Sequence, residues 1–380
     1  FNAAKCNTGG GYNTAVGLCA LHTNTTSSHN TAIGDSALKV NTGANNTAVG
    51  KSALIANTSG ENNTSLGSCA LDANTTASNN TAVGANSLGA NTTGASNTAV
   101  GVNALDANTT GNNNIGVGAS AGQAITTGSS NTAVGQNSLQ ATTTASDNTA
   151  IGLNSLYTNT TGAENTGVGV SSLEKNTTGG QNASFGRQTL CANTTGCFNT
   201  GLGAVALHTN STGDCNTAVG SGALQKNTTA DNNTAVGYET MKFNTTGTNN
   251  TAVGTCALES NTTANGNTAV GYISLETNTT GANNSALGLE TLNKNTTGAS
   301  NTAVGRSALE KNTTGNQNTA AGMNAMKATT TGSLNVAIGD YSLDANTTGT
   351  RNASLGSESL GSNTTGNDNT GIGQCALKTN

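Results

Sequence analysis

The sequence predicts an all-β protein, a parallel β-solenoid of the β-roll type with 17 residues per coil and about 22 stacked coils. Three observations predict this fold class. The chain repeats a single motif from end to end, the motif suits short strands and bends, and charged residues are confined to six positions within it.

The repeat is clearest in NTAVGVNALDANTTGNN, from Asn97 to Asn113. We number its positions 1 to 17 from that Asn, so that Thr98 is position 2. The opening Asn recurs twenty-two times from Asn13 to Asn369, always at steps of seventeen residues except for one step of sixteen after Asn30. A fixed period in this range is typical of stacked solenoids. We therefore expect residues 1–380 to form one continuous repeat domain.

The elements of one coil follow from residue types. Gly, Asn, Thr and β-branched residues give the repeat a low helix propensity. Positions 1 to 4 alternate as in a strand, which Gly101 at position 5 ends. Ala104 and Leu105 begin a second segment, and Asn108–Gly111 form a third that closes in a turn.

Composition limits the interior and the partners. Aromatic residues make up 2% and charged residues 8% of the chain, and Trp and Pro are missing. The interior is therefore expected to be thin and filled by Val, Leu, Ala and Thr. The net charge of −5 is spread thinly, with no basic stripe for nucleic acid and no apolar run as long as a membrane helix.

The inward positions are predicted from what each position accepts. Position 4 is nearly always Val, Ile or Leu, and position 9 nearly always Leu, whereas all charged residues occupy positions 6, 7, 10, 11, 16 or 17. We expect columns of equivalent residues in successive coils, here called ladders, to form the core. The representative core-ladder residues are Val100, Leu105, Val134, Leu139, Val219, Leu224, Val304 and Leu309.

One repeat deviates. In Asn114–Ser130 the Leu of position 9 is Gly122, and the Asn of position 12 is Ile125. We expect Ile125 to fill the volume that Gly122 vacates, which places position 12 on the inside.

Asn-x-Ser/Thr patterns allow two interpretations. At position 12 an internal Asn ladder, which satisfies buried polar groups, is favoured over a coat of glycans. Its representatives are Asn74, Asn91, Asn108, Asn159, Asn176 and Asn227. Glycans are more plausible at position 17, whose candidates are Asn45, Asn62, Asn79, Asn232, Asn249 and Asn283.

The eight Cys suggest cross-links only in part. Cys197 and Cys215, at positions 16 and 17 of adjacent coils, are candidates for a disulfide. Cys6 and Cys375 are candidates for bonds between subunits in an oxidising exterior. Tolerance of small residues at variable positions is the competing interpretation.

No pattern predicts chemistry. Calcium-binding solenoids use Asp in their turns, whereas these turns use Asn and Gly. His22, His29 and His208 are isolated, and no catalytic set recurs, so we expect no metal, no cofactor and no enzymatic activity. Thr rows at positions 2, 13 and 14 raise ice binding as a further hypothesis.

We expect no capping repeat at either end, because Phe1–Tyr12 reads as a degraded partial repeat and QCALKTN as a faithful one. We expect either a section of a longer rod or ends that stack on other copies into a filament.

The motif NTAVGxxAL resembles the head repeats of YadA-like trimeric autotransporter adhesins and the arrays of tail-fibre-like surface proteins of bacteria and phages. The resemblance covers essentially the whole chain, although the adhesin repeat is shorter and NTTG is an added segment. It implies a parallel β-roll, with a trimer as one option, used as an extracellular stalk or adhesive fibre.

Together these observations favour a structural, extracellular or cell-surface protein, a solenoid rod that stacks end to end or forms the shaft of a fibre. Its expected partners are copies of itself, end to end or laterally, with glycans as a further option. The alternatives are a spacer or binding module of an adhesin or phage fibre, and an ice-binding solenoid.

Overall fold

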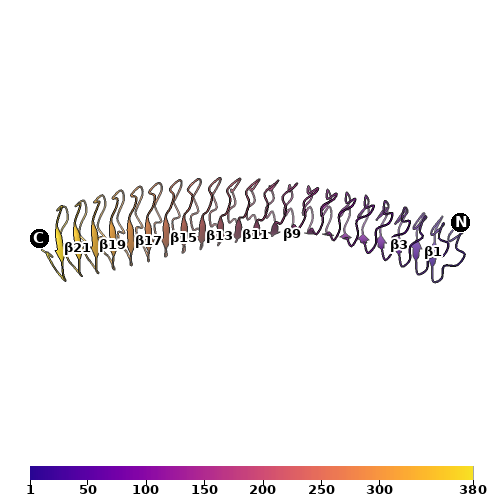
Figure 1. Ribbon diagram of the computed structural model, residues 1–380, viewed down its shortest axis with the longest axis horizontal. Helices are drawn as coiled ribbons and strands as arrows, with labels where there is room; N and C mark the ends of the chain where they lie inside the picture. Colours follow the sequence, from indigo (N-terminus) through magenta and orange to yellow (C-terminus); the bar gives the residue numbers. More distant parts are fainter. Residues whose placement is uncertain (380) are drawn as a thin grey trace. The chain divides into compact units, whose positions relative to one another are not determined.

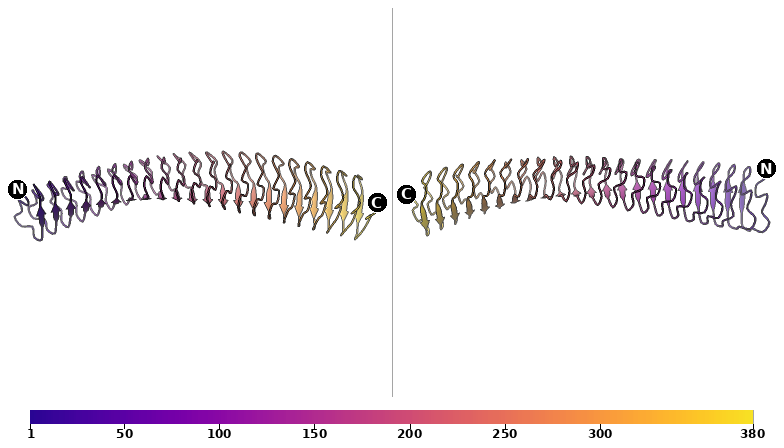
Figure 2. Two further views of the ribbon diagram at one scale, coloured as in Figure 1. Left: turned by 180° about the vertical axis from the view of Figure 1, so that it is seen from behind. Right: turned by 45° about the horizontal axis from the view of Figure 1, so that its top comes forward.

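A computed structural model describes residues 1–379 and confirms the all-β solenoid, with twenty-two parallel strands at a spacing of about one repeat. The chain comprises two compact units, Phe1–Thr195 and Gly196–Asn380, each built in the same way. Each coil contributes one three-residue strand, and successive arrows point the same way (Figures 1 and 2).

The strands of the first unit are β1 (Thr14–Val16), β2 (Thr31–Ile33), β3 (Thr47–Val49), β4 (Thr64–Leu66), β5 (Thr81–Val83), β6 (Thr98–Val100), β7 (Ile115–Val117), β8 (Thr132–Val134), β9 (Thr149–Ile151), β10 (Thr166–Val168) and β11 (Ala183–Phe185). Those of the second unit are β12 (Thr200–Leu202), β13 (Thr217–Val219), β14 (Thr234–Val236), β15 (Thr251–Val253), β16 (Thr268–Val270), β17 (Ser285–Leu287), β18 (Thr302–Val304), β19 (Thr319–Ala321), β20 (Val336–Ile338), β21 (Ala353–Leu355) and β22 (Thr370–Ile372).

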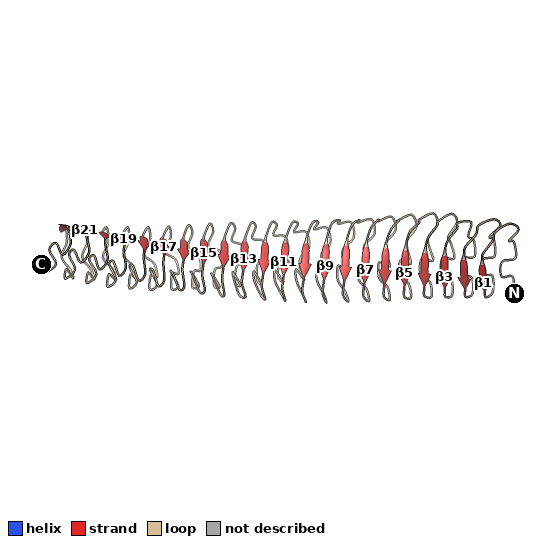
Figure 3. Cartoon of the chain, turned by 90° about the horizontal axis from the view of Figure 1, so that it is seen from below, coloured by secondary structure: helices blue, strands red, loops and turns tan. Residues whose placement is uncertain are grey.

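Like residues lie over like residues within each unit. In β5 and β6, Thr81 pairs with Thr98 and Val83 with Val100, and this register recurs from strand to strand. Figure 3 shows strands such as β5, β7 and β9 side by side along one wall, with loops completing every coil. A period of seventeen residues therefore returns each position to the same place in the next coil.

Only the first of the three expected segments is a strand. Left-handed backbone at positions 7, 9 and 17 interrupts the extended chain, with φ of 57° at Asn103, 51° at Leu105 and 58° at Asn113. These corners still bond to their neighbours, because Leu105 N–H donates to the Ala121 carbonyl and Asn113 N–H to the Ala95 carbonyl, at 3.0 and 3.1 Å. Asn tolerates this conformation better than most residues, which accounts for its frequency at positions 7 and 17.

Position 5 requires glycine because the backbones of two successive coils approach each other closely there. Gly101 has φ of 139°, and a Cβ there would lie 2.4 Å from the Gly118 carbonyl oxygen of the next coil. A side chain at this position would push the coils apart, so every coil keeps Gly where its strand ends.

The core consists of Ala at positions 3 and 8, Leu at position 9 and Asn at positions 1 and 12. The predicted Leu residues are fully buried: Leu105, Leu139, Leu224 and Leu309. The prediction for position 4 was wrong, because that side chain points out of the coil. The Val residues concerned are half-buried or exposed: Val100, Val134, Val219 and Val304.

Strand alternation explains the correction. Ala99 at position 3 faces inward with no exposed surface, so Thr98 and Val100 on either side must face outward. The space inside position 3 is already filled by Leu of the preceding coil. A Cβ on Gly116, which occupies position 3 of its coil, would lie only 2.9 Å from Leu105 Cγ. Position 3 therefore accepts Ala, Ser or Gly, and the bulky residue goes outside.

The deviating coil is arranged as the sequence suggests. Ile125 is fully buried, and a Cβ added to Gly122 would lie 3.0 Å from Ile125 Cδ1 and 2.8 Å from Leu105 Cδ2. Ile125 thus occupies space that Leu fills elsewhere. The exchange also leaves the Oδ1 of Asn108 buried without a hydrogen-bond partner, because Ile125 offers no donor.

We expect Gly122→Leu and Ile125→Asn to be strongly coupled. Gly122→Leu alone overpacks the coil at a cost of about 1–3 kcal/mol. Ile125→Asn alone opens a void beside Gly122. The double variant restores the regular repeat and gives Asn108 Oδ1 a donor, so a double-mutant cycle should show a favourable coupling of about 1–3 kcal/mol. Hydrogen exchange of amides in this coil measures it, and additive effects would contradict the proposed exchange of volume.

Candidate functional site

Two columns of buried Asn hold each coil closed. Asn108 Nδ2 donates to Asn91 Oδ1 of the preceding coil at 2.9 Å and to the Gly111 carbonyl of its own coil at 3.0 Å. Asn97 Nδ2 donates to the same Gly111 carbonyl at 2.9 Å. The Oδ1 of Asn97 accepts the backbone N–H of Asn114 at 2.9 Å. The amide side chains therefore satisfy buried backbone groups within and between coils.

These contacts confirm the Asn ladder at position 12. All six representatives are buried with no exposed surface: Asn74, Asn91, Asn108, Asn159, Asn176 and Asn227. A glycan on any of them is incompatible with the folded coil, because the Nδ2 that would carry it already donates two hydrogen bonds inside, as Asn108 shows.

Position 17 is different. The six candidates there are all exposed: Asn45, Asn62, Asn79, Asn232, Asn249 and Asn283. They lie at the left-handed corner before the strand, with φ of 60° at Asn45 and 59° at Asn283. Their glycosylation is sterically open and stays a prediction.

The four cysteines proposed for cross-links lie at the following places in the coils. Cys215 N–H donates to the Cys197 carbonyl at 3.1 Å, so the two residues lie on adjacent coils. Cys375 is exposed at position 7, and its thiol lies 3.8 Å from Glu358 Oε2. Cys6 is half-buried, with its N–H on the His22 carbonyl at 3.2 Å. The disulfide and the bonds between subunits stay predictions.

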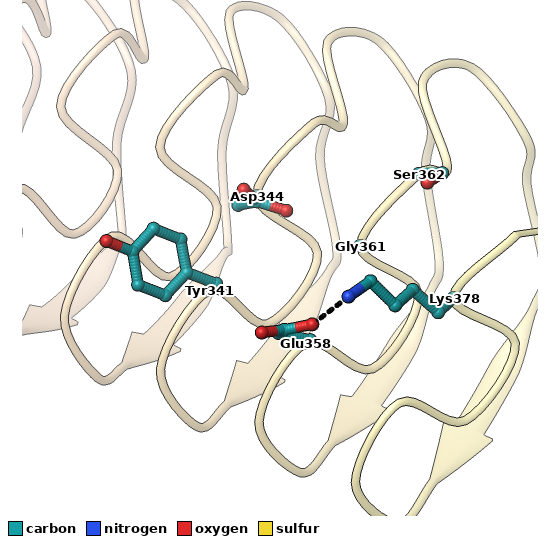
Figure 4. Close-up of a pocket in the computed structure, with 6 residues that line it drawn as sticks. All are labelled: Tyr341, Asp344, Glu358, Gly361, Ser362 and Lys378. Atoms are coloured by element: carbon teal, nitrogen blue, oxygen red, sulfur yellow. Dashed lines mark hydrogen bonds and ion pairs between the residues drawn. The ribbon is translucent and has the colours of Figure 1, made fainter.

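A shallow pocket opens in the second unit where Gly361 replaces a larger residue at position 10. Its lining comprises Tyr341, Asp344, Glu358, Gly361, Ser362 and Lys378. Figure 4 shows the Lys378 side chain extended toward Glu358, with which it forms an ion pair. Burial raises the pKa of Asp344 above its usual value.

Sequence reasoning missed this pocket. Its signal was a glycine at position 10, a column that carries longer side chains in every other coil except at Gly89, and here the glycine lies between Asp344 and Lys378. Glu358 neutralises Lys378, so the charge of this lysine is already paired within the chain. We therefore interpret the pocket as a gap between packed surface side chains.

A second cluster combines positions 7 and 10 of two coils. Glu239, Cys256 and Glu259 each offer one atom of a kind that can bind a metal ion, and these three atoms lie within 4.8 Å of one another. Glu239 is already paired with Lys242 at 2.7 Å. The pKa of Cys256 is raised to about 11, mainly by burial of the thiol and secondly by the nearby Glu259 carboxylate.

We expect Cys256 to alkylate slowly at pH 8.5 and its rate to keep rising up to about pH 11, because only the thiolate reacts. Glu259→Gln removes a negative charge beside the thiol, lowers its pKa and should raise the rate at pH 8.5 severalfold, up to about tenfold per unit of pKa. Glu290→Gln, two coils away, is the control. Peptide mass spectrometry after timed iodoacetamide treatment measures both, and equal rates would refute the electrostatic cause.

The chain was compared with known proteins. No model of a known protein family matches it, and no curated protein does. Among residues 1–379, no helix has the length and apolar character needed to span a membrane.

Proposed function

We propose that the chain is a structural, non-catalytic protein of the cell surface or extracellular space, a solenoid that stacks into a filament or forms the shaft of a fibre. Its work is mechanical, and its partners are copies of itself.

The observation that carries this proposal is the sameness of the bonding between coils in both units. In the first unit, Thr98 N–H donates to the Asn114 carbonyl at 2.9 Å and Leu105 N–H to the Ala121 carbonyl at 3.0 Å. In the second, Thr302 and Leu309 make the equivalent bonds, at 2.8 and 3.0 Å. Successive coils carry a load along the stack in series, and these interfaces resist it with the same set of backbone bonds, which suits a shaft.

Cryo-electron microscopy of native material tests the proposal. The expected result is fibres with an axial layer of about 4.8 Å, the spacing between strands. Immunogold labelling of whole cells tests the location, with label expected outside the cell. Monomeric particles at every concentration, or label confined to the interior, would overturn the proposal.

Ice binding is a second candidate, favoured by the Thr of position 14. Thr110 and its equivalents are exposed in the described coils, and nearly all are Thr although neighbouring exposed positions vary freely. Their hydroxyls form a regular column outside the coil. Inhibition of ice recrystallisation that is lost in Thr93→Lys/Thr110→Lys would support this candidate, and inhibition that the variant retains would exclude this column.

A further inference from the structure

The outer face of the strands carries a continuous uncharged surface. We call it the strand wall and define it as the side chains at positions 2 and 4 of every coil, such as Thr98 and Val100 in β6. Its position-4 residues are large and apolar yet accessible: Val100 is 37% exposed in the first unit and Leu287 is 51% exposed in the second. Each unit thus turns one row of Thr and one row of branched apolar side chains toward its surroundings.

The strand wall excludes charge although it is exposed. The thirteen Lys and Arg and the eighteen Asp and Glu of the chain all lie at other positions, most of them on exposed or half-buried turns. Position 6 is only two residues from the wall and carries Asp35, Lys51 and Arg187. Solvent-facing strands normally tolerate charge, so its exclusion from positions 2 and 4 indicates that this face is covered in the working assembly.

The area is sufficient for a stable contact. Eleven strands at about 4.8 Å, each three residues or about 10 Å long, give a wall of roughly 500 Å² in each unit. Two such walls in contact would bury roughly 1,000 Å² in total, which reaches the lower bound of about 1,000 Å² for a specific interface.

We propose that the strand wall packs against the strand wall of a second copy of this chain. This inference rests on the proposed function, in which the partners of the chain are copies of itself. Rows of Thr and of Val, Ile or Leu repeat in register, so the wall is complementary to itself and gives a contact in which each copy uses the same patch. Two such sheets pack face to face about 10 Å apart, with their side chains interdigitated.

Three coils supply a matched test, because each has an apolar residue both in the wall and at position 6. The wall variant is Val100→Lys/Ile151→Lys/Leu287→Lys. The control is Val102→Lys/Leu153→Lys/Leu289→Lys, which adds the same charges at exposed residues in a column where Lys51 occurs naturally. A milder wall variant, Val100→Thr/Ile151→Thr/Leu287→Thr, places β-branched Thr, a residue that favours strands, at all three positions and guards against misfolding.

Sedimentation of the full chain over the order of 1–100 µM, with circular dichroism to verify folding, is the readout. Wild type and control should associate alike, the Lys variant should raise the dissociation constant at least about 30-fold, and the Thr variant should raise it less. A wild type that stays monomeric throughout, or equal weakening by wall and control variants, would overturn the proposal. The proposal would also be overturned by a monomeric wild type whose inhibition of ice recrystallisation is lost in the wall variant, because the strand wall would then bind ice instead of a second copy.

The same variants separate this inference from the proposed function. Fibres that form equally well from wild type and from the folded wall variant, with unchanged width, would refute the role of the wall and leave the structural function standing. The absence of any assembly by the wild type would refute both.

Discussion

Leu105→Ala should destabilise its coil by about 2–5 kcal/mol, whereas Val100→Ala in the same coil should cost less than about 1 kcal/mol. Leu105 has no exposed surface and packs beneath position 3 of the next coil, so its truncation leaves a cavity. Val100 is 37% exposed and loses few contacts inside the coil.

Hydrogen exchange of amides in coils 97–113 and 114–130 measures this difference, because a repeat array opens locally rather than as one unit. The measurement belongs in dilute protein, where contacts between copies do not contribute. Equal costs for the two truncations would show that Val100 is a core residue after all, and would contradict the outward direction of position 4.

Asn97→Asp should destabilise the coil by about 3–5 kcal/mol at pH 7, because it places an unpaired charge in the buried column. The change preserves shape and leaves an oxygen to accept the Asn114 N–H, but it removes the N–H that donates to the Gly111 carbonyl. Two acceptors then face each other without a proton between them.

The cost should depend on pH. Burial raises the pKa of a carboxyl group in the folded state above its unfolded value of about 3.9. The folded state therefore binds more protons, so stability is lost as pH rises from about 3 and is regained on acidification. Asn113→Asp is the matched control, because position 17 is exposed and naturally carries Asp147 and Asp368. Urea unfolding at pH 3 and pH 7 measures both, and a cost of Asn97→Asp that is independent of pH would refute the buried-charge account.

Much of the coil was predictable from residue patterns. The period gave the number of residues per coil, and the deviation at Gly122 and Ile125 placed position 12 inside, where the structure has it. The second and third segments were less predictable. Asn at positions 7 and 17 is compatible with the left-handed corners at Asn103 and Asn113, but the corner at Leu105 depends on how the chain returns to the next coil, which no local propensity specifies. Leu in particular disfavours this conformation, and its burial offsets the strain.

The candidate sites divide in the same way. The Asn columns were visible as polar positions that change in few coils, at position 12 only to Ile125, Thr142 and Thr329. The hydrogen bonds that both columns donate to carbonyls such as that of Gly111 explain why Asn is kept. The cluster of Glu239, Cys256 and Glu259 was not visible, because variable residues of two coils meet only once positions 7 and 10 are placed in space.

By itself, the sequence determined the solenoid, its seventeen-residue coil, the buried Leu column and the inward Asn of position 12. Only the tertiary structure decided which face of the strand is the interior. Alternation puts Val100 and Ala99 on opposite faces and says nothing of which one lies inside, and hydrophobicity alone points to Val. The Leu of position 9 already fills the interior beside position 3 of the next coil, as Leu105 does at Gly116, so the small residue faces inward and the Val is left outside, in the strand wall.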